Sequence, residues 1–403
     1  MESILNEYPE AITPTTFPWF DYSKYSFSLG LEYKGTCYLS GHSASEYDEL
    51  SGKMVIKGGM EEQIHTAFSK IEHILSSAGL GIDDIFHIVE YVTNSGIEYY
   101  DKVIETRSKI LGSGTPAIST ILVDELLRPD ALIEIEVTAG RRNPSDSLTR
   151  EHQIGTSTAR GSDDSVFLST VYPYDDDGIL VGLDDPVAQV NQIFVNAQKR
   201  LQSIGLSMSN IARTIEMLRP EALAMYKETG RVRKEFLGPV YPAAAGILQS
   251  QVAPDPNVLI AYDFVASRHQ LKAINPGWSR YNKLTYSPGV RAGNILFLSG
   301  QAALDPESQK AVYTGDIVSQ TEYTYRNHLR VVEEAGMRAS DVVQTVEFIT
   351  KRGLPDYRGT AEIRKKLFSA PYPASTGVIC HKLLRPEFDI EIIPLAIDSS
   401  EDN

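Results

Sequence analysis

The chain has 403 residues, of which 42% are hydrophobic and 23% are charged, as in an ordinary globular protein. Its formal net charge is −15 and it has no long Lys/Arg run, so we expect no nucleic-acid partner, because the overall field repels phosphates. No apolar run reaches the length of a membrane span. Two cysteines cannot form a disulfide framework, and the N-terminus lacks the pattern of a secretory signal. Both features predict a cytoplasmic protein.

The sequence repeats one frame of residues three times. In each copy a Gly stands 11 residues before a Glu, a Tyr follows after 10 residues, an Arg after 7 more and a Pro-Ala pair after 9 more. The three sets are Gly79, Glu90, Tyr100, Arg107 and Pro116; Gly205, Glu216, Tyr226, Arg233 and Pro242; and Gly336, Glu347, Tyr357, Arg364 and Pro373. This register indicates three tandem copies of one unit. We expect unit 1 at 1–145, unit 2 at 146–270 and unit 3 at 271–403, each the size of one domain.

Unit 1 shows the pattern of elements most clearly. Met60, Ile64, Phe68 and Leu75 lie on one face of a predicted helix, which Gly79 ends. In chain order we predict a strand at 35–41, a helix at 60–78, a strand at 85–93, a helix at 97–111 and strands at 117–126 and 131–139, with one more strand before residue 35.

The other two units repeat this order of elements. In unit 2 we predict strands at 165–170, 211–219, 243–252 and 258–266, a helix at 186–204 and a helix through Arg233; in unit 3, strands at 294–300, 342–350, 374–384 and 388–397, a helix at 316–335 and a helix through Arg364. Polar stretches at 141–153 and 267–283 are the expected linkers. The fold class is therefore α+β, with a mixed sheet and two helices on one face in each unit. The helix-free faces are also apolar, so the three sheets should pack against one another.

The motifs "ILFLSGQAALDP", "EEAGMRASDVVQTVEFIT", "PYPASTGV" and "DIEIIPLAI" in unit 3 resemble the reactive intermediate deaminase family, also called the Rid or YjgF/YER057c/UK114 family. Unit 1 resembles it through "YLSGH", "LSSAGLGIDDIFHIVEYVT", "TPAIST" and "ALIEIEVTA", and unit 2 keeps only the spacing. The resemblance implies a chorismate-mutase-like fold and a trimer with a central barrel and clefts between subunits. One chain with three units would then form an intramolecular pseudo-trimer, as a monomer or a low-order oligomer of pseudo-trimers.

The family's activity is hydrolysis of enamine and imine intermediates to a ketone and ammonia. Its typical active members carry an Arg directly after the Pro-Ala pair, where it binds a substrate carboxylate. This chain has Ile118, Ala244 and Ser375 at those positions. Because an uncharged side chain cannot replace a guanidinium, we expect poor activity on simple 2-imino acids.

The resemblance also implies an acidic catalytic residue on the last strand of the unit. Glu134 and Glu391 occupy that position, whereas unit 2 has Ala261. Each of the two glutamates lies in an apolar strand, where an unpaired carboxylate is costly. The alternative is a structural, ion-paired glutamate.

The remaining candidates are expected to bind substrate. They are Tyr25 and Tyr286 near the start of a unit, His42 and Gln301 after the "SG" turn, Ser119 and Ser375 after the Pro-Ala pair, Glu136 two residues beyond Glu134, and the repeated Arg107 and Arg364. The repeated Glu and Arg have a second interpretation, a structural ion pair between strand and helix. That interpretation is favoured by their retention in the degenerate unit 2.

We therefore expect a divergent Rid-type enzyme that acts on a small unsaturated metabolite by carboxylate-assisted water addition or proton transfer. Two alternatives remain open: a non-hydrolytic tautomerase, lyase or cyclase, and a ligand-binding protein without catalysis. The sequence has no CxxC, no HExxH and no phosphate-binding loop, so we expect no metal and no cofactor.

Overall fold

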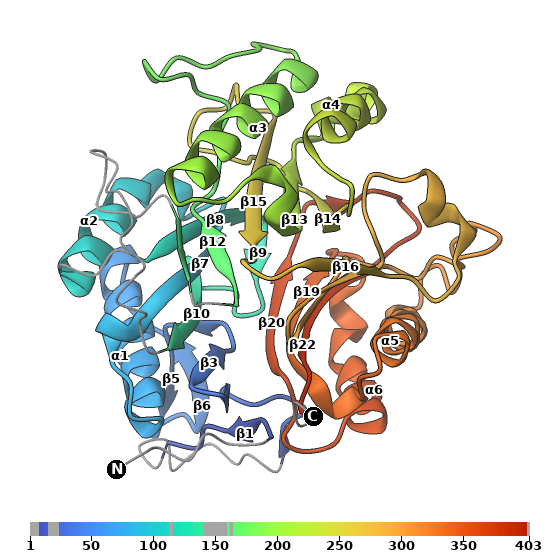
Figure 1. Ribbon diagram of the computed structural model, residues 1–403. Coiled ribbons are helices and arrows are strands. Elements are labelled where there is room, and N and C mark those ends of the chain that lie inside the picture. The colour runs from blue at the N-terminus through green and yellow to red at the C-terminus, as the bar shows by residue number, and fades with distance from the viewer. Residues whose placement is uncertain (1–7, 15–23, 113–115, 141–158, 162–163, 401–403) are drawn as a thin grey trace.

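The computed structural model describes residues 8–14, 24–112, 116–140, 159–161 and 164–400, and its helices lie at the periphery with the strands toward the middle (Figure 1). The expected linker at 141–153 falls outside the described residues. In each unit two α-helices cover one face of a sheet, so the molecule is α+β with repeated domains. None of the described helices combines the length and apolar composition needed to cross a bilayer.

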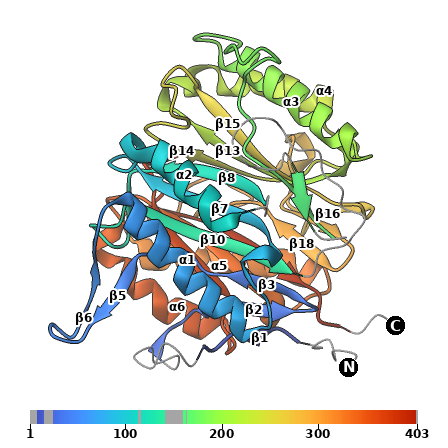
Figure 2. The same ribbon diagram turned by 90° about the vertical axis from the view of Figure 1, so that its left-hand side faces the viewer.

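Unit 1 forms a sheet in the order β1-β2-β3-β10-β7-β8, with β4 also paired to β10 and only β7 and β8 parallel. Figure 2 shows α1 and α2 lying across this sheet, with the hairpin β5–β6 projecting from it. Its elements are β1 (Glu10–Ala11), β2 (Gly30–Tyr33), β3 (Thr36–Leu39), β4 (His42–Ser43), β5 (Ser45–Asp48), β6 (Lys53–Ile56), α1 (Met60–Ser77), a 3₁₀ turn (Ile82–Asp84), β7 (Ile85–Thr93), a 3₁₀ turn (Ile97–Tyr99), α2 (Tyr100–Leu111), β8 (Ala117–Val123), β9 (Glu125–Leu126) and β10 (Ile133–Gly140).

Unit 2 has the sheet order β11-β12-β15-β13-β14-β21, in which β21 comes from unit 3. Its elements are β11 (Ala159–Gly161), β12 (Val166–Leu168), α3 (Pro186–Ser203), a 3₁₀ turn (Met208–Asn210), β13 (Ile211–Leu218), a 3₁₀ helix (Pro220–Glu228), α4 (Thr229–Phe236), β14 (Ala243–Leu248) and β15 (Ile260–Ala266).

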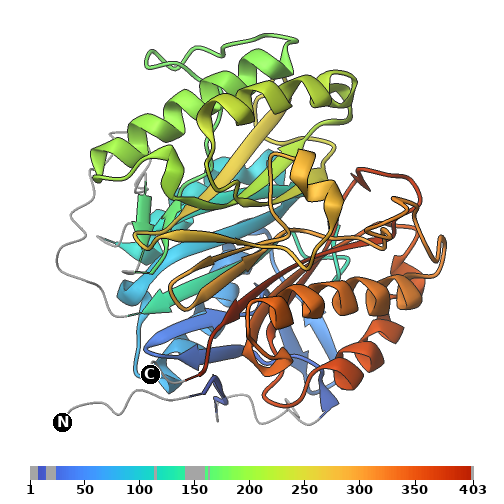
Figure 3. The same cartoon turned by 45° about the vertical axis from the view of Figure 1, so that its right-hand side comes forward.

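Unit 3 has the sheet order β16-β17-β18-β22-β19-β20-β9, in which β9 comes from unit 1. Its helices lie outside its sheet (Figure 3). Its elements are β16 (Leu271–Ile274), a 3₁₀ turn (Ser279–Lys283), β17 (Gly289–Ala292), β18 (Ile295–Leu298), α5 (Ile317–Glu334), a 3₁₀ turn (Ala339–Asp341), β19 (Val342–Ile349), a 3₁₀ turn (Leu354–Gly359), α6 (Thr360–Leu367), β20 (Ala374–Ile379), β21 (Lys382–Leu383) and β22 (Ile390–Ile397).

Two short strands tie the units together and correct the predicted strand bounds. The run predicted as one strand at 117–126 divides into β8 and β9, because β9 leaves its own sheet to pair with β20 of unit 3. The run at 374–384 divides in the same way, and β21 pairs with β14 of unit 2. The expected linker at 267–283 is also wrong, since it contains β16 and a 3₁₀ turn that belong to unit 3.

The predicted ends of the first helices are confirmed by backbone geometry. Gly79, Gly205 and Gly336 have φ angles of +72°, +73° and +79° and follow the last residues of α1, α3 and α5. In this left-handed region glycine has no steric cost, so the repeated Gly ends each helix.

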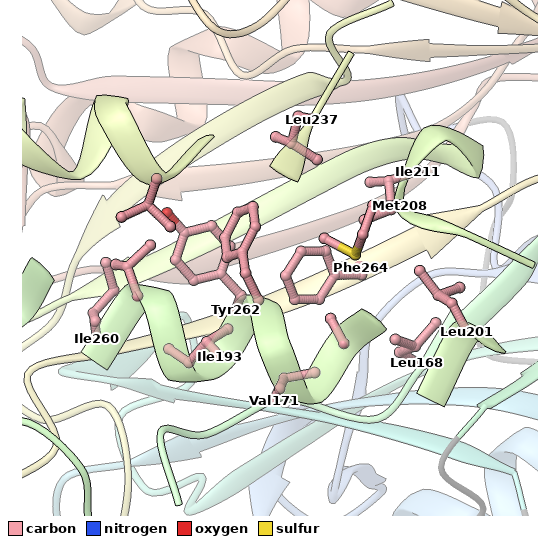
Figure 4. Packing of buried hydrophobic residues seen from close by; sticks show 14 of the residues in the cluster. Leu168, Val171, Ile193, Leu201, Met208, Ile211, Leu237, Ile260, Tyr262 and Phe264 are labelled. Atoms are coloured by element: carbon pink, nitrogen blue, oxygen red, sulfur yellow. The ribbon is translucent and has the colours of Figure 1, made fainter. Parts of the chain in front are cut away.

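Apolar packing occurs at two levels. Between its helices and its sheet each unit has a core of its own, shown for unit 2 in Figure 4, where Ile193 and Leu201 of α3 face Tyr262 and Phe264 of β15. On the helix-free faces, residues of all three units share two further clusters; one of them contains Val89, Met217 and Phe348. The hydrogen-bonded strand orders are open, however, so the expected closed central barrel is not formed among the described residues.

Candidate active site

The repeated Glu and Arg form ion pairs between the sheet and the second helix of each unit. The pairs are Glu90–Arg107 at 2.6 Å, Glu216–Arg233 at 3.2 Å and Glu347–Arg364 at 2.8 Å. In unit 3 the Glu347 carboxylate also accepts hydrogen bonds from the hydroxyls of Tyr325 (2.5 Å) and Tyr357 (2.6 Å). The repeated Glu and Arg therefore pair between strand and helix in all three units, as the structural interpretation expects.

A cleft of about 260 Å³ lies between unit 1 and unit 3, and we call it the 1–3 cleft. Unit 1 contributes β4 and β10 to it, and unit 3 contributes β20 and α6. Its lining residues are Tyr25, Phe27, Leu29, Gly41, His42, Ser43, Ser45, Met54, Lys70, Leu127, Arg128, Glu134, Tyr357, Arg364, Ser375 and Gly377.

Glu134 is the buried carboxyl group of the 1–3 cleft. Strand alternation directs it away from the helices, because its neighbours Ile133 and Ile135 pack into the helix-covered core. A Cβ on Gly41 would overlap the Glu134 carboxylate, so glycine at this turn makes room for the acid. Burial raises the pKa of Glu134 to about 7, against the opposing effect of the Lys70 ammonium.

Lys70 extends from α1 to this cleft. Its Nζ donates hydrogen bonds to the carbonyl oxygens of Ser43 (2.7 Å) and Ser45 (3.0 Å). Burial lowers the pKa of Lys70 to about 8. His42 is also buried, which lowers its pKa to about 3, and its Nε2 lies 3.2 Å from the carbonyl oxygen of Leu29. His42 is therefore neutral at physiological pH.

A larger cleft of about 550 Å³ lies between unit 2 and unit 3, and we call it the 2–3 cleft. In the 2–3 cleft the buried acid comes from unit 3, as it comes from unit 1 in the 1–3 cleft. Unit 2 supplies the neighbouring wall, as unit 3 does in the 1–3 cleft. The lining residues are Glu216, Tyr226, Lys227, Gly230, Arg231, Arg233, Lys234, Ala244, Ala245, Gly246, Trp278, Arg280, Tyr281, Lys283, Leu284, Thr285, Tyr286, Gly300, Gln301, Ala302, Leu304, Pro306, Leu384, Arg385, Phe388 and Glu391.

Glu391 is the buried carboxyl group of the 2–3 cleft. Its carboxylate accepts a hydrogen bond from the backbone N–H of Gly246 in unit 2, and a Cβ on Gly300 would overlap it. Burial raises the pKa of Glu391 to about 8, which the Gly246 N–H opposes. Both clefts therefore hold a carboxyl group that changes its protonation state near neutral pH.

Strand register shows that these two acids are equivalent and that unit 2 lacks one. Ile135 pairs with Glu90 and Ile392 pairs with Glu347, so Glu134 and Glu391 directly precede the residue opposite the repeated Glu. In unit 2 the residue before that position is Ala261. The junction of units 1 and 2 consequently has no carboxylate at this point of the strand.

The structure distributes the sequence candidates over two clefts, a central cavity and, for Arg107, a buried ion pair. Tyr25, His42, Ser375, Arg364 and Glu134 meet in the 1–3 cleft. Tyr286, Gln301 and Glu391 meet in the 2–3 cleft. Arg107 lines neither cleft, since its guanidinium is buried on Glu90 within unit 1.

Ser119 and Glu136 instead line a small central cavity of about 40 Å³ between the three sheets. Glu136 accepts a hydrogen bond from Thr376, and Asp263 accepts one from Thr170 at 2.6 Å. Burial raises the pKa of both carboxyl groups to about 7. These acids therefore face the centre of the molecule rather than either cleft.

Arg128 and Arg385 are site residues that the sequence reasoning missed. The two are equivalent, because β9 and β21 lead directly into them and place one in each cleft. The signal was present as the duplicated tetrapeptide "LLRP" at 126–129 and 383–386. Each cleft thus combines a buried carboxyl group with a guanidinium that can bind an anion.

Within the described ranges, no group of three or more His, Cys, Asp or Glu side chains could hold a metal ion. The polar groups that converge on each cleft are a titrating carboxyl, an arginine and aromatic hydroxyls, a set suited to proton transfer and anion binding.

Comparisons with known proteins match two of the three units, units 1 and 3. A sequence model of the family described as Endoribonuclease L-PSP matches residues 22–140 and 280–397. The 2-iminobutanoate/2-iminopropanoate deaminase of Dermatophagoides farinae is 34% identical over 93 residues, which cover 23% of this chain and 70% of that protein. Reactive Intermediate Deaminase A, chloroplastic, of Arabidopsis thaliana is 36% identical over 109 residues, or 27% of this chain and 57% of that protein.

Among solved structures, a crystal structure of a chorismatase superposes with a TM-score of 0.52 at 16% sequence identity. The match covers 78% of this chain and 93% of that one. At this identity the likeness is one of fold alone, and it extends over more of the chain than any single unit.

Proposed function

Because the chain belongs to the reactive intermediate deaminase (Rid, YjgF/YER057c/UK114) family, we propose that it hydrolyses an imine or enamine to a carbonyl compound and ammonia. The observation that carries the proposal is the buried carboxyl group of each cleft, Glu134 and Glu391, with a pKa near neutral pH. A general base is most effective when its pKa lies near the working pH. Relatives named as deaminases support the same reaction class.

The proposed chemistry needs one group that accepts and then returns a proton. The glutamate carboxylate takes a proton from water while the water oxygen bonds to the carbon of a protonated C=N group. The resulting carbinolamine receives that proton on nitrogen. The C–N bond then breaks to release ammonia, and loss of the hydroxyl proton leaves the carbonyl product.

Arg128 and Arg385 take over anion binding in this proposal. Family resemblance places an arginine directly after the Pro-Ala pair, where this chain has Ile118, Ala244 and Ser375. An arginine from the β9 or β21 loop lines the same cleft as the acid and supplies a guanidinium from another direction. A substrate carboxylate would therefore bind in a different orientation from that in the family's typical members, and for this reason we expect poor activity on simple 2-imino acids.

We further propose that the three units act as a pseudo-trimer and that the single chain completes both clefts. Three contacts between units support this. Strand β9 pairs with β20, strand β21 pairs with β14, and the backbone N–H of Thr170 donates a hydrogen bond to the carbonyl oxygen of Ile118 at 3.0 Å. The partner is then a small-molecule substrate, and no second chain is required.

Ammonia release tests the reaction class directly. Amino-acid oxidases generate imines in place from glutamate, aspartate, phenylalanine and serine, and formation of ammonia is followed with and without the protein. We expect acceleration with acidic or aromatic imines and little with the imine from serine. If no imine in this set is hydrolysed faster than in buffer, the proposed reaction is wrong.

A further inference from the structure

The 2–3 cleft is strongly basic although the whole chain carries a net charge of −15. Its basic lining residues are Lys227, Arg231, Arg233, Lys234, Arg280, Lys283 and Arg385. The acidic lining residues are Glu216 and Glu391. Positive side chains gathered in a concave site concentrate anions there even when the rest of the surface repels them.

Arg233 is the one basic residue of this lining whose charge is already matched, by Glu216 at 3.2 Å. Lys227, Arg231, Lys234 and Lys283 form no ion pair with any described residue. Arg231 and the three lysines are exposed at the rim, where they can turn toward a ligand.

Two further arginines lie deeper and are held by neutral groups. Arg280 donates a hydrogen bond to the hydroxyl of Tyr286 (3.2 Å), and its guanidinium lies 5.3 Å from the ring centroid of Tyr281. Arg385 donates to the carbonyl oxygen of Gln309 (3.0 Å). A hydrogen bond to a neutral acceptor leaves the positive charge uncompensated.

The acidic side chains near the rim do not change this balance. Glu228 and Glu235 flank two of the rim lysines in sequence, yet neither lines the cleft. Inside the cleft, burial raises the pKa of Glu391 to about 8, so at pH 7.5 most of this carboxyl group is protonated and adds little negative charge.

The 1–3 cleft provides a contrast within the same molecule. Its basic lining residues are Lys70, Arg128 and Arg364. Arg364 is paired with Glu347, and the Nζ of Lys70 is hydrogen-bonded to the carbonyl oxygens of Ser43 and Ser45. Arg128 is left as the main anion-binding group. The two equivalent clefts therefore differ in charge. They also differ in volume, about 260 Å³ for the 1–3 cleft and about 550 Å³ for the 2–3 cleft.

Aromatic side chains form one wall of the 2–3 cleft. Trp278 and Tyr281 stack with their ring centroids 5.9 Å apart, and Tyr286 packs edge-on against Tyr281 at 5.5 Å. Phe388 also lines the cleft. Such a wall favours a flat or cyclic ligand body over a short aliphatic chain.

We propose that the 2–3 cleft binds a ring-containing small molecule that carries at least two anionic groups, whereas the 1–3 cleft binds a smaller ligand with one. The inference assigns a substrate class to a site of the proposed function, and it concerns binding rather than turnover. Carboxylates and phosphate esters share the required chemistry, so the experiment distinguishes them.

Titration calorimetry of the full chain at low ionic strength tests the charge requirement with three probes. Benzoate carries one negative charge, whereas isophthalate and phenyl phosphate carry about two at pH 7.5. We expect one tight site for a dianion, with a Kd at least about tenfold below that of benzoate. Preference for isophthalate identifies carboxylates as the natural groups, and preference for phenyl phosphate identifies phosphate. Equal affinities for benzoate and both dianions overturn the proposal.

A matched pair of variants localises the site. Neutralising two rim charges in K227Q/K234Q should weaken dianion binding about tenfold and benzoate binding much less. The control K53Q/K272Q removes the same charge from exposed positions outside the cleft and should change neither affinity. An equal loss in both double variants means that only the overall charge matters and contradicts a built site.

The result is separable from the proposed hydrolysis. E391Q removes the proposed base but keeps the basic lining, so its dianion affinity should stay within about threefold of wild type. Dianion binding without ammonia release would count against the enzyme proposal alone. Hydrolysis without any preference for dianions would count against the ligand class alone.

Discussion

At the scale of single residues, the proposed activity depends on carboxyl groups that titrate near neutral pH. If Glu391 acts as a base, turnover in its cleft requires the ionised form and rises with pH through a pKa of about 8; the corresponding value for Glu134 is about 7. We expect kcat to increase across pH 6–8.5 and to level off above. The Gln variant of either residue should lose its own inflection from the pH–kcat profile, while a profile unchanged in both variants would exclude this role.

The same pKa shift predicts how stability depends on pH. The ordinary pKa of a Glu carboxyl is 4.5, so between pH 4.5 and about 8 the folded state keeps a proton on Glu391 that the unfolded state has released. The free energy of unfolding must therefore fall as pH rises through this window. We predict that the Tm of wild type decreases between pH 5 and 8 and that the decrease is smaller in E391Q. Parallel Tm curves for the two proteins would contradict the burial argument.

At the scale of elements, the buried ion pair between strand and helix fixes how each second helix lies on its sheet. Arg364 of α6 binds Glu347 of β19, which two tyrosine hydroxyls also contact. Arg364→Met leaves a buried carboxylate without its cation and should cost about 3–5 kcal/mol of unfolding free energy in denaturant titrations. Lys365→Gln, which breaks an exposed pair with Glu362 on the same helix, should cost less than about 1 kcal/mol. Similar losses of unfolding free energy in both variants would show that the buried ion pair stabilises the fold no more than an exposed one.

Element prediction from sequence succeeded where the pattern is local. The face of α1, the Gly that ends it and the alternation of β10 are properties of short windows, and the structure has them. The divisions between β8 and β9 and between β20 and β21 were not predictable, because the partner of each short strand belongs to another unit. The β16 segment was hidden for a different reason: it is a four-residue edge strand whose two middle residues, Lys272 and Ala273, are exposed.

The candidate site was predictable only in part. The family resemblance pointed to Glu134 and Glu391, and the structure places both in clefts. Ser119 and Glu136 were expected to bind substrate but line the central cavity, because how the sheets of different units pack together is not encoded in any short window of the sequence. The roles of Arg128 and Arg385 could not be predicted, because they depend on which neighbouring unit the "LLRP" loop contacts.

At the scale of the whole molecule, one chain provides both clefts from three unequal units. Units 1 and 3 each contribute a buried acid, while unit 2 has Ala261 and serves as the neighbour that completes the cleft of unit 3. We predict that multi-angle light scattering at micromolar concentration finds no obligate trimer of the 44.6 kDa chain, because one chain already supplies all three units. An obligate assembly of three chains would contradict the intramolecular arrangement.

The most direct test of the central claim, that Glu134 and Glu391 serve two separate active clefts, is the rate of ammonia release by E134Q, E391Q and the double variant. Gln keeps the volume and removes the base, and loss of a general base typically costs about 100- to 10,000-fold. We predict that each single variant loses the activity of its own cleft and that the double variant loses nearly all activity. D263N, which alters the central cavity, should stay close to wild type. Wild-type turnover in the double variant, with its Tm unchanged, would contradict the central claim.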